Sequence, residues 1–416
     1  MKSKKYLHIT PLFYSIGDAA EQIYWASVSA ASSGKKINII SPYDWTQVLS
    51  YKICNKELFR LNINEDKGFD AISFIYLSIV RLFVNLYFFL RRVISLLNRK
   101  YFHYQLNEEW SFPFIGMQSY WIPTYSKNLD YSKIILNERV CNTFPIPSIG
   151  IRNKIECACS KKLFGYGIPN DAKYVCLHVR DAGFHGDEKR RSYRNADIDN
   201  YQKGISYLID KGFYVFRMGD SKMRKMNKNN ERLIDYPFTS LKSEEMDLYL
   251  IKNCQFYIGM QSGIYSVAAL FNKPILLLNM ISWFYPYPFK SCDRGMLKKL
   301  KIGNSGHPLT LKDWFNLPFN YLDANALLLN DFIFIEHNPD EILNAITEYH
   351  LDYESGFTRP LSPFQIDAFD NYRKASRLIM NNENPVITGN FFLKAPTEIT
   401  RLAMNNMNSF GALYDF

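Results

Sequence analysis

The sequence lacks the signatures of several large classes of protein. Its N-terminus, MKSKKYLHITPLF, has no sustained apolar core and no cleavage site, so we predict no signal peptide. The basic residues are dispersed and no zinc finger or other nucleic-acid signature is present, so nucleic acid is not an expected partner. The Gln261-Ser262-Gly263 turn is not followed by Gly-Lys-Ser/Thr, which excludes a Walker loop there.

Cysteine is scarce and irregularly spaced. Cys157-Ala158-Cys159 has no zinc spacing and no second pair elsewhere. Cys176 and Cys254 lie in or beside apolar runs, where a free thiol behaves as a small hydrophobic group. We therefore predict reduced thiols and a cytoplasmic protein.

The composition is that of a large globular chain. Its 416 residues suffice for two domains, and 47% of them are hydrophobic. The formal net charge of +10 favours anionic partners such as nucleotide phosphates or acidic lipid head groups.

The stretch from Tyr174 to Asp220 predicts a β-loop-α-β unit. The apolar run 174–177 is typical of a buried strand, Asp197 is placed to cap a helix over 201–209, and 213–216 predicts a second strand. Later runs predict strands at 256–259 and 274–279 with a helix over 264–271 between them. The pattern is that of a parallel α/β sheet.

Polar residues follow three of these predicted strands. His178, Arg180 and Asp181 follow the first, with Arg194 in the next loop. Gly219-Asp220 follows the second strand, and Gln261-Ser262-Gly263 follows the third. Parallel sheets bind ligands at these ends, and arginine suits phosphate because a guanidinium makes bidentate bonds. The alternative for each strand end is a solvated tip with a local ion pair.

The chain also begins with a βαβ pattern. A strand at 6–10, a helix at 19–33 and a strand at 37–40 surround the Gly17-Asp18 turn. This turn follows the first strand, where it can face an interdomain cleft. The alternative is that Asp18 is an ordinary helix N-cap.

Residues 71–90 form the most apolar segment, AISFIYLSIVRLFVNLYFFL, and Arg91 and Arg92 follow it. We expect a helix that lies on an anionic inner leaflet. The alternatives are a buried helix and a membrane span. We divide the chain into an N-terminal α/β domain (1–165), a C-terminal α/β domain (166–350) and a helical tail (351–416) that is a candidate to pack back on the first domain.

Two long runs and the N-terminal turn resemble a known family. YVCLHVRDAGF and IGMQSGIYSVAALFNKPILLLN resemble a group of bacterial glycosyltransferases encoded with surface-polysaccharide genes, and more remotely the fucosyltransferase-like branch of the GT-B enzymes. SIGDAAEQIYWASVSAASSGKK is similar to their N-terminal glycine turn and helix. The resemblance covers 6–42 and 174–279. It implies two Rossmann-like domains facing a cleft, the GT-B fold, with residues 1–165 as the acceptor-side domain and residues 166–350 as the nucleotide-sugar-binding domain.

The resemblance implies roles for the strand-end residues. Arg180 would hold the donor diphosphate and His178 would line the same pocket. Gly17 would face the cleft from the first domain. We assign donor binding to Arg180, Arg194, Gly219, Asp220, Gln261, Ser262 and Gly263. The remote branch often has Arg-Arg or Arg-Gly where this chain has Arg180-Asp181, which leaves the donor sugar open.

The implied activity is transfer of a sugar, from a GDP-sugar in preference, to a glycan or lipid-linked glycan at the inner face of the cytoplasmic membrane. An inverting reaction needs a base, and the candidates are Asp18, Asp181 and, as the weaker one, His178. No DxD motif stands at a strand end, because Asp197-Ile198-Asp199 suits a helix cap. We therefore expect transfer without metal or cofactor. The alternatives are a sugar-nucleotide epimerase or hydrolase and a non-catalytic glycan-binding subunit.

Overall fold

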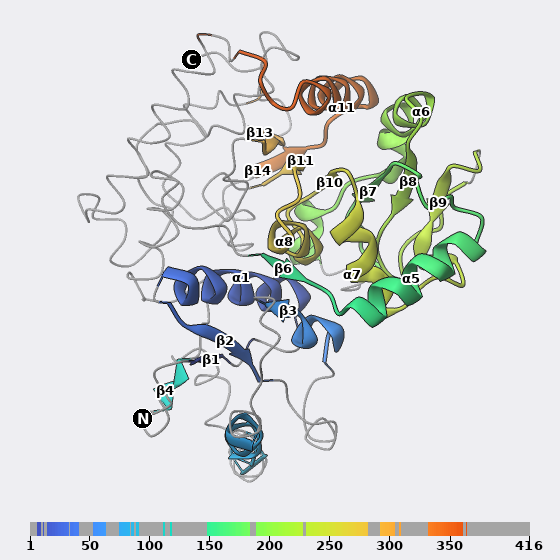
Figure 1. Cartoon of the computed structure of the whole chain (residues 1–416). Helices are drawn as coiled ribbons and strands as arrows, with labels where there is room; N and C mark the ends of the chain where they lie inside the picture. The colour runs from blue at the N-terminus through green and yellow to red at the C-terminus, as the bar shows by residue number, and fades with distance from the viewer. Residues whose placement is uncertain are drawn as a thin grey trace.

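The centre of the molecule is a six-stranded sheet (Figure 1). The computed structural model describes residues 6–9, 11, 15–32, 34–40, 53–63, 75–83, 85–86, 89–90, 111–112, 117–118, 148–183, 189–227, 230–281, 292–303, 308, 332–360 and 363. Every strand pair in the sheet is parallel, and the strand order is β12-β11-β10-β7-β8-β9. The predicted parallel α/β sheet is confirmed.

These strands form because their residues are apolar on both faces. The run 174–177 is fully buried, as is β11 over its whole length, which is the pattern of a sheet covered on both sides. The six strands are β7 (Tyr174–His178), β8 (Tyr214–Arg217), β9 (Leu233–Asp235), β10 (Tyr257–Gly259), β11 (Ile275–Met280) and β12 (Arg294–Leu297).

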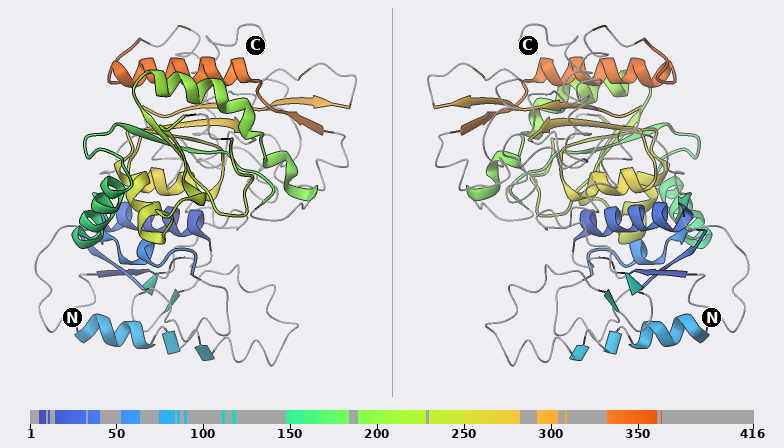
Figure 2. Two further views of the ribbon diagram at one scale, coloured as in Figure 1. Left: turned by 90° about the vertical axis from the view of Figure 1, so that its right-hand side faces the viewer. Right: turned by 90° about the vertical axis from the view of Figure 1, so that its left-hand side faces the viewer.

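Helices cover both faces of the sheet (Figure 2). Val175 and Leu177 point to one face, where they pack with α6 (Gln202–Asp210) and α11 (Pro339–Glu354). Cys176 alternates to the other face. The helices packed there are α5 (Asn153–Gly165), α7 (Glu244–Asn253) and α8 (Gly263–Leu270).

Local signals in the sequence set several helix starts. Ser243 Oγ accepts a hydrogen bond from Met246 N and caps α7. Asn338 and Glu341 form a capping box at the start of α11. Asp197 accepts from Asp199 N and caps the short 3-10 helix η5 (Ile198–Tyr201), which runs into α6.

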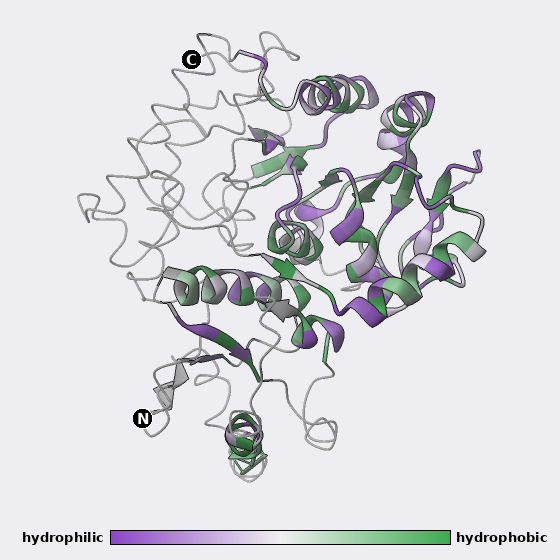
Figure 3. Ribbon diagram, viewed as in Figure 1, coloured by the Kyte–Doolittle hydropathy of each residue, from purple (hydrophilic) through white to green (hydrophobic). Residues whose placement is uncertain are grey.

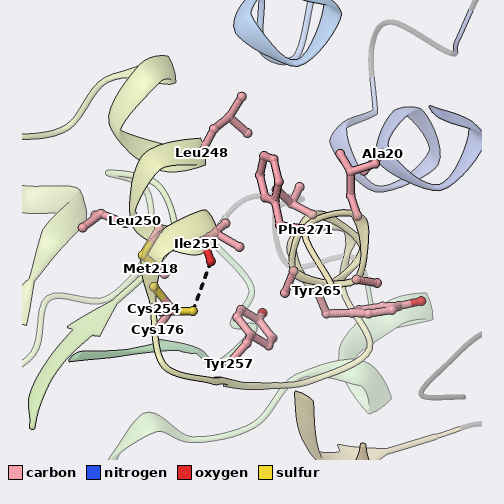
Figure 4. Close-up of a cluster of buried hydrophobic side chains, with 14 of the residues drawn as sticks. Ala20, Cys176, Met218, Leu248, Leu250, Ile251, Cys254, Tyr257, Tyr265 and Phe271 are labelled. Atoms are coloured by element: carbon pink, nitrogen blue, oxygen red, sulfur yellow. Dashed lines mark hydrogen bonds between the residues drawn. The ribbon is translucent and has the colours of Figure 1, made fainter. Parts of the chain in front are cut away.

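An N-terminal βαβ unit packs against this sheet through one helix. β1 (Tyr6–Ile9) and β2 (Lys36–Ile39) are parallel, and α1 (Ile16–Ser32) connects them. α1 lies along α8, and the small side chains of Ala19, Ala20 and Ala26 are fully buried in the same cluster as the sheet. Figure 4 shows Ala20 facing the α8 side of this cluster. Small residues allow the two helices to approach closely.

The remaining elements are short. β3 pairs with β6, β4 with β5, and β13 with β14, each pair antiparallel. All six cysteines in the described part of the chain are free thiols. The bounds are η3 (Glu57–Arg60), β3 (Asn62–Ile63), β4 (Ser111–Phe112), β5 (Met117–Gln118), β6 (Ile149–Gly150), η4 (Lys189–Arg194), η6 (Tyr236–Phe238), β13 (Lys299–Ile302) and β14 (Phe332–Ile335).

The structure adds three strands that the sequence analysis did not predict and decides one alternative. Leu233–Asp235 forms the edge strand β9 within a polar segment. β12 and β13 were not predicted either, because the buried Arg294 interrupts the apolar pattern of β12, and Lys299 and Lys301 interrupt that of β13. Asp18 is not an N-cap, because α1 begins earlier and places this residue inside its first turn. Of the predicted tail, residues 361–362 and 364–416 lie outside the described residues.

The apolar segment 71–90 is helical over 75–83, 85–86 and 89–90, and its other residues lie outside the described part. No helix within the described ranges has the length and hydropathy needed to cross a membrane. Both the two-domain division and the GT-B arrangement remain predictions.

The contact between α1 and α8 leads to a first test. A Cβ added at Gly17 would lie 2.4 Å from the Cα of Gly263, where no flexible side chain can give way. We expect Gly17→Ala to separate the two helices and lower the Tm by several degrees in a thermal melt. Gly165→Ala is the matched control, because its added Cβ meets nothing within 4 Å. Equal melting of the two variants would contradict the close contact.

Candidate functional site

The candidate site lies where the strand order of the central sheet reverses. β7, β8 and β9 follow one another towards one edge, whereas β10, β11 and β12 run towards the other. β7 and β10 are therefore neighbours at a topological switch point. Open α/β sheets bind ligands outside the carboxyl ends of such strands. His178 ends β7, and Gln261-Ser262 follows β10 at the same edge.

His178 and Ser262 contact each other across this switch point. Ser262 Oγ lies 3.0 Å from His178 Nδ1, within hydrogen-bond distance. Burial, together with the positive charges of Arg217 and Arg180, lowers the pKa of His178 to about 3. The imidazole is therefore neutral at physiological pH, and a pKa this low makes it a poor proton acceptor.

Arg180 is held beside this pair. Its side chain is 8% exposed, and its Nη1 donates to Asn195 Oδ1 at 2.7 Å. Its carbonyl oxygen accepts from Ala196 N at 2.9 Å. The loop that follows η4 therefore fixes both the side chain and the backbone of Arg180. A guanidinium held in a fixed orientation at a strand end suits an anionic ligand.

Arg194 connects the same loop to the β10 end. Its Nη2 donates to the carbonyl oxygen of Gln261 at 3.0 Å. Its Nε is buried and has no hydrogen-bond partner within the described part of the chain. The Gln261 side chain is used structurally, since its Oε1 accepts from Ile281 N at 2.8 Å. Both residues are predicted to bind the nucleotide-sugar. Of the two, Arg194 keeps an N–H group, at Nε, that can form a further hydrogen bond.

Asp18 approaches the site from the N-terminal unit. Burial raises the pKa of its carboxyl group, while a hydrogen bond with Ser15 and the charge of Arg194 oppose the shift. Asp18 follows Gly17, which lies against Gly263, and Arg194 donates to the nearby Gln261, so the first turn of α1 lies close to Arg194. A carboxylate whose pKa is raised is a better proton acceptor than an ordinary aspartate.

Asp181 is occupied by the backbone around it. Its Oδ1 accepts from Gly183 N and its Oδ2 from Arg224 N, both at 2.9 Å. Its Oδ2 also lies 3.9 Å from Nη2 of the fully buried Arg217. These contacts tie the loop after β7 to the loop after β8. Both carboxylate oxygens of Asp181 therefore already accept hydrogen bonds, which indicates a structural role.

Gly219 and Asp220 form the turn after β8. Gly219 has a φ of +146°, and a Cβ there would lie 2.0 Å from Met223 Sδ, so this turn requires glycine. Asp220 Oδ1 accepts from Lys222 N at 2.7 Å and closes the turn. The structure thus brings this turn to the carboxyl edge, where the sequence predicted it.

The start of α8 completes the site. The first backbone N–H groups of a helix have no partner within the helix and carry its positive dipole end. Gly263 is the first residue of α8, and Gly17 lies against it. Both α1 and α8 therefore begin at this point. Within the described ranges, no group of three or more His, Cys, Asp or Glu could hold a metal ion, and metal-independent chemistry remains a prediction.

Comparisons with known proteins find only distant structural likeness. No family model and no curated protein matches the sequence. Several solved structures are similar to the chain. A family 9 glycosyl transferase from Veillonella parvula is 12% identical, with a TM-score of 0.41 over 70% of this chain and 86% of that one.

The second is ADP-heptose LPS heptosyltransferase II from E. coli, which is 14% identical with a TM-score of 0.41 over 84% of this chain and 99% of that one. The third is the dodecameric iron-containing heptosyltransferase TibC in complex with ADP-D-β-D-heptose, which is 11% identical with a TM-score of 0.34 over 85% of this chain and 78% of that one. Likeness at this level carries no argument about the activity of this chain.

The sequence analysis missed Lys298 and Asn195. The Nζ of Lys298 donates to the carbonyl oxygens of Tyr193 at 3.1 Å and Asn195 at 2.5 Å, which bracket Arg194. Burial lowers the pKa of Lys298 to about 8. Lys298 therefore holds the loop that presents Arg194 and supports Arg180. The one available signal was a lysine between two apolar strand-like runs, RGML and KLKI.

Removal of Lys298 gives a second test. Lys298→Met leaves two carbonyl groups without their donor, and we expect the unfolding free energy to fall by about 2–4 kcal/mol in urea denaturation. The native pKa is about 8 and the usual value is 10.5, so the unfolded chain binds more protons between these pH values. The wild type should therefore gain stability relative to the variant as pH rises through this window.

Lys301→Met is the matched control, three residues along the chain on β13. It should show neither the large loss nor the relative change with pH. A Lys298→Met curve parallel to that of the wild type from pH 7 to pH 10.5 would contradict a buried charged lysine at this position.

Proposed function

We propose that this chain is a glycosyltransferase that moves a sugar from a nucleoside diphosphate sugar to a hydroxyl of a growing glycan. One observation carries the proposal. Two partly desolvated arginines, Arg180 and Arg194, stand with the start of α8 at the sheet's switch point, and the half-buried carboxyl of Asp18 on α1 interacts electrostatically with Arg194. Such a transfer requires positive groups that stabilise the anionic leaving group and a base that accepts the proton of the acceptor hydroxyl.

The leaving diphosphate is assigned to the cationic side of the site. When the bond between the anomeric carbon and the phosphate oxygen breaks, the electron pair goes to the diphosphate. Arg180, Arg194 and the N–H groups of Gly263 and its neighbours can stabilise that charge without a metal ion. In this proposal Ser262 and His178 line the donor pocket, and Gly219 and Asp220 contact the ribose or the base.

The proton acceptor is assigned to Asp18. Its raised pKa and its place opposite the arginines support this choice. Asp181 is engaged by two backbone N–H groups and His178 has a pKa of about 3, so both are weaker candidates. As the acceptor oxygen bonds to the anomeric carbon, its proton passes to the Asp18 carboxylate. This course inverts the anomeric centre.

The donor and the location are finer parts of the proposal. The family resemblance implies a GDP-sugar, and the ADP-heptose bound by TibC makes ADP the rival to include in any test. The acceptor is a glycan or lipid-linked glycan, and the enzyme works at the inner face of the cytoplasmic membrane. The alternatives are a sugar-nucleotide epimerase or hydrolase and a non-catalytic glycan-binding subunit.

Nucleotide binding is the first test of the proposal. We expect one of ADP, GDP, UDP, CMP or dTDP to raise the Tm by several degrees, because a ligand that binds only the native state stabilises it. Arg180→Ala should abolish the shift. Arg232→Ala is the control, because this arginine packs over Tyr214, outside the candidate site. Absence of any shift in the wild type would favour the glycan-binding alternative.

Replacement of Asp18 separates catalysis from stability. We expect Asp18→Asn to reduce kcat by about 10³-fold or more, because general-base catalysis contributes roughly 10²–10⁴-fold. Because the native pKa is raised, ionisation of Asp18 destabilises the folded state as pH rises, so at pH 8 the variant should melt about 1–3 °C higher than the wild type. In the wild type, kcat/KM should fall as pH drops through the raised pKa.

The matched variant is Asp181→Asn. Its lost charge should lower the Tm, because Asp181 joins two loops beside the buried Arg217. If Asp181→Asn abolished turnover while Asp18→Asn retained it, the assignment of the base would be reversed.

A further inference from the structure

The helical segment 75–90 exposes an apolar face. Ten large hydrophobic side chains are exposed among the described residues, and six of them lie in this one segment. Such a concentration is unusual, because single exposed hydrophobic residues are normally scattered. The six are Ile75, Ile79, Leu82, Phe83, Leu86 and Leu90, each 44–58% exposed.

Four of these side chains, Ile75, Ile79, Leu82 and Phe83, share one side of the continuous described helix 75–83. At the α-helical rotation per residue, their positions fall within an arc of roughly 100°. Val80 is buried at 3% on another side of this helix, and Asn85 is fully buried. The ring of Tyr76 packs against His8 of β1 at 5.8 Å between centroids. The helix is thus attached to the N-terminal unit through one side and turns its apolar side outward.

The figures agree with this arrangement. The segment is the light blue helix at the lower edge of both views in Figure 2, on the far side of β1 and β2 from the six-stranded sheet. Figure 3 shows hydrophobic residues, in green, along this helix.

The charge around the segment identifies the kind of partner. From residue 71 to residue 107 the sequence contains no Asp or Glu, but five basic residues, Arg81, Arg91, Arg92, Arg99 and Lys100. A protein partner would require a complementary apolar groove, whereas an acidic bilayer offers apolar depth and negative charge together. The net charge of +10 of the whole chain adds to its attraction to an anionic bilayer.

We propose that the apolar face of residues 75–90 docks on an anionic bilayer surface, with Leu82 and Phe83 near the centre of the inserted patch. The helix lies in the plane of the interface and its apolar side chains enter the boundary between head groups and acyl chains. The proposal thus names the residues that would contact the membrane. It depends on no step of the transfer reaction, so it stands or fails independently of the proposed activity.

Vesicle flotation tests the docking surface. The full chain should float with phosphatidylcholine vesicles that contain 30% phosphatidylglycerol, by about tenfold more than with pure phosphatidylcholine. Raised salt should weaken the binding, because it screens the charge. Leu82→Ser combined with Phe83→Ser should lower the bound fraction on the anionic vesicles at least tenfold.

Phe164→Ser is the matched control, because Phe164 is an equally exposed phenylalanine on α5. It should bind like the wild type, and all the variants should keep the wild-type Tm. The proposal is overturned if the wild type fails to float, or if the Phe164 variant loses binding as much as the Leu82/Phe83 pair. It is also overturned if light scattering finds a wild-type dimer that this pair dissolves while vesicle binding is unchanged, since the face would then join two copies.

Discussion

The close contact between α1 and α8 is the constraint on which the site depends. Gly17 and Gly263 let the first turns of the two helices meet without side chains between them. Because both helices begin there, the residues that follow each start share one region. Asp18 is thereby brought from the N-terminal unit to the edge of a sheet formed more than 150 residues later. Without that contact the carboxylate and the arginines would belong to separate halves of the chain.

Backbone carbonyl groups hold two cations on this side of the site. Arg194 donates to the carbonyl oxygen of Gln261, and Lys298 donates to those of Tyr193 and Asn195. A neutral carbonyl group satisfies such a donor without adding a negative charge. Arg217 is different, because Asp235 binds it at 2.9 Å. Its charge, also close to Asp181, still helps to keep His178 neutral.

The sequence predicted those parts of the fold that depend on local pattern. β7, β8, β10 and β11 are continuous apolar runs, because parallel strands are buried on both faces. β9 was missed because a strand of only three residues within a polar segment shows no hydrophobic periodicity. β12 was missed because Arg294 is buried there against Asp352, an ion pair that joins residues far apart in the sequence. Lys298 was missed for a related reason, since its partners are backbone carbonyl groups about 100 residues away.

Other contacts between distant parts of the chain connect the proposed membrane surface with the candidate site. The exposed helix 75–90 rests on β1 through Tyr76 and His8, β1 precedes α1, and α1 meets α8 at the site. A helix held at a bilayer would therefore be separated from Asp18 by one strand and the start of one helix. If the acceptor is lipid-linked and the helix docks on the bilayer, as proposed, the acceptor hydroxyl would reach the N-terminal side of the site first. That is the side on which the proposed base stands, opposite the arginines assigned to the donor.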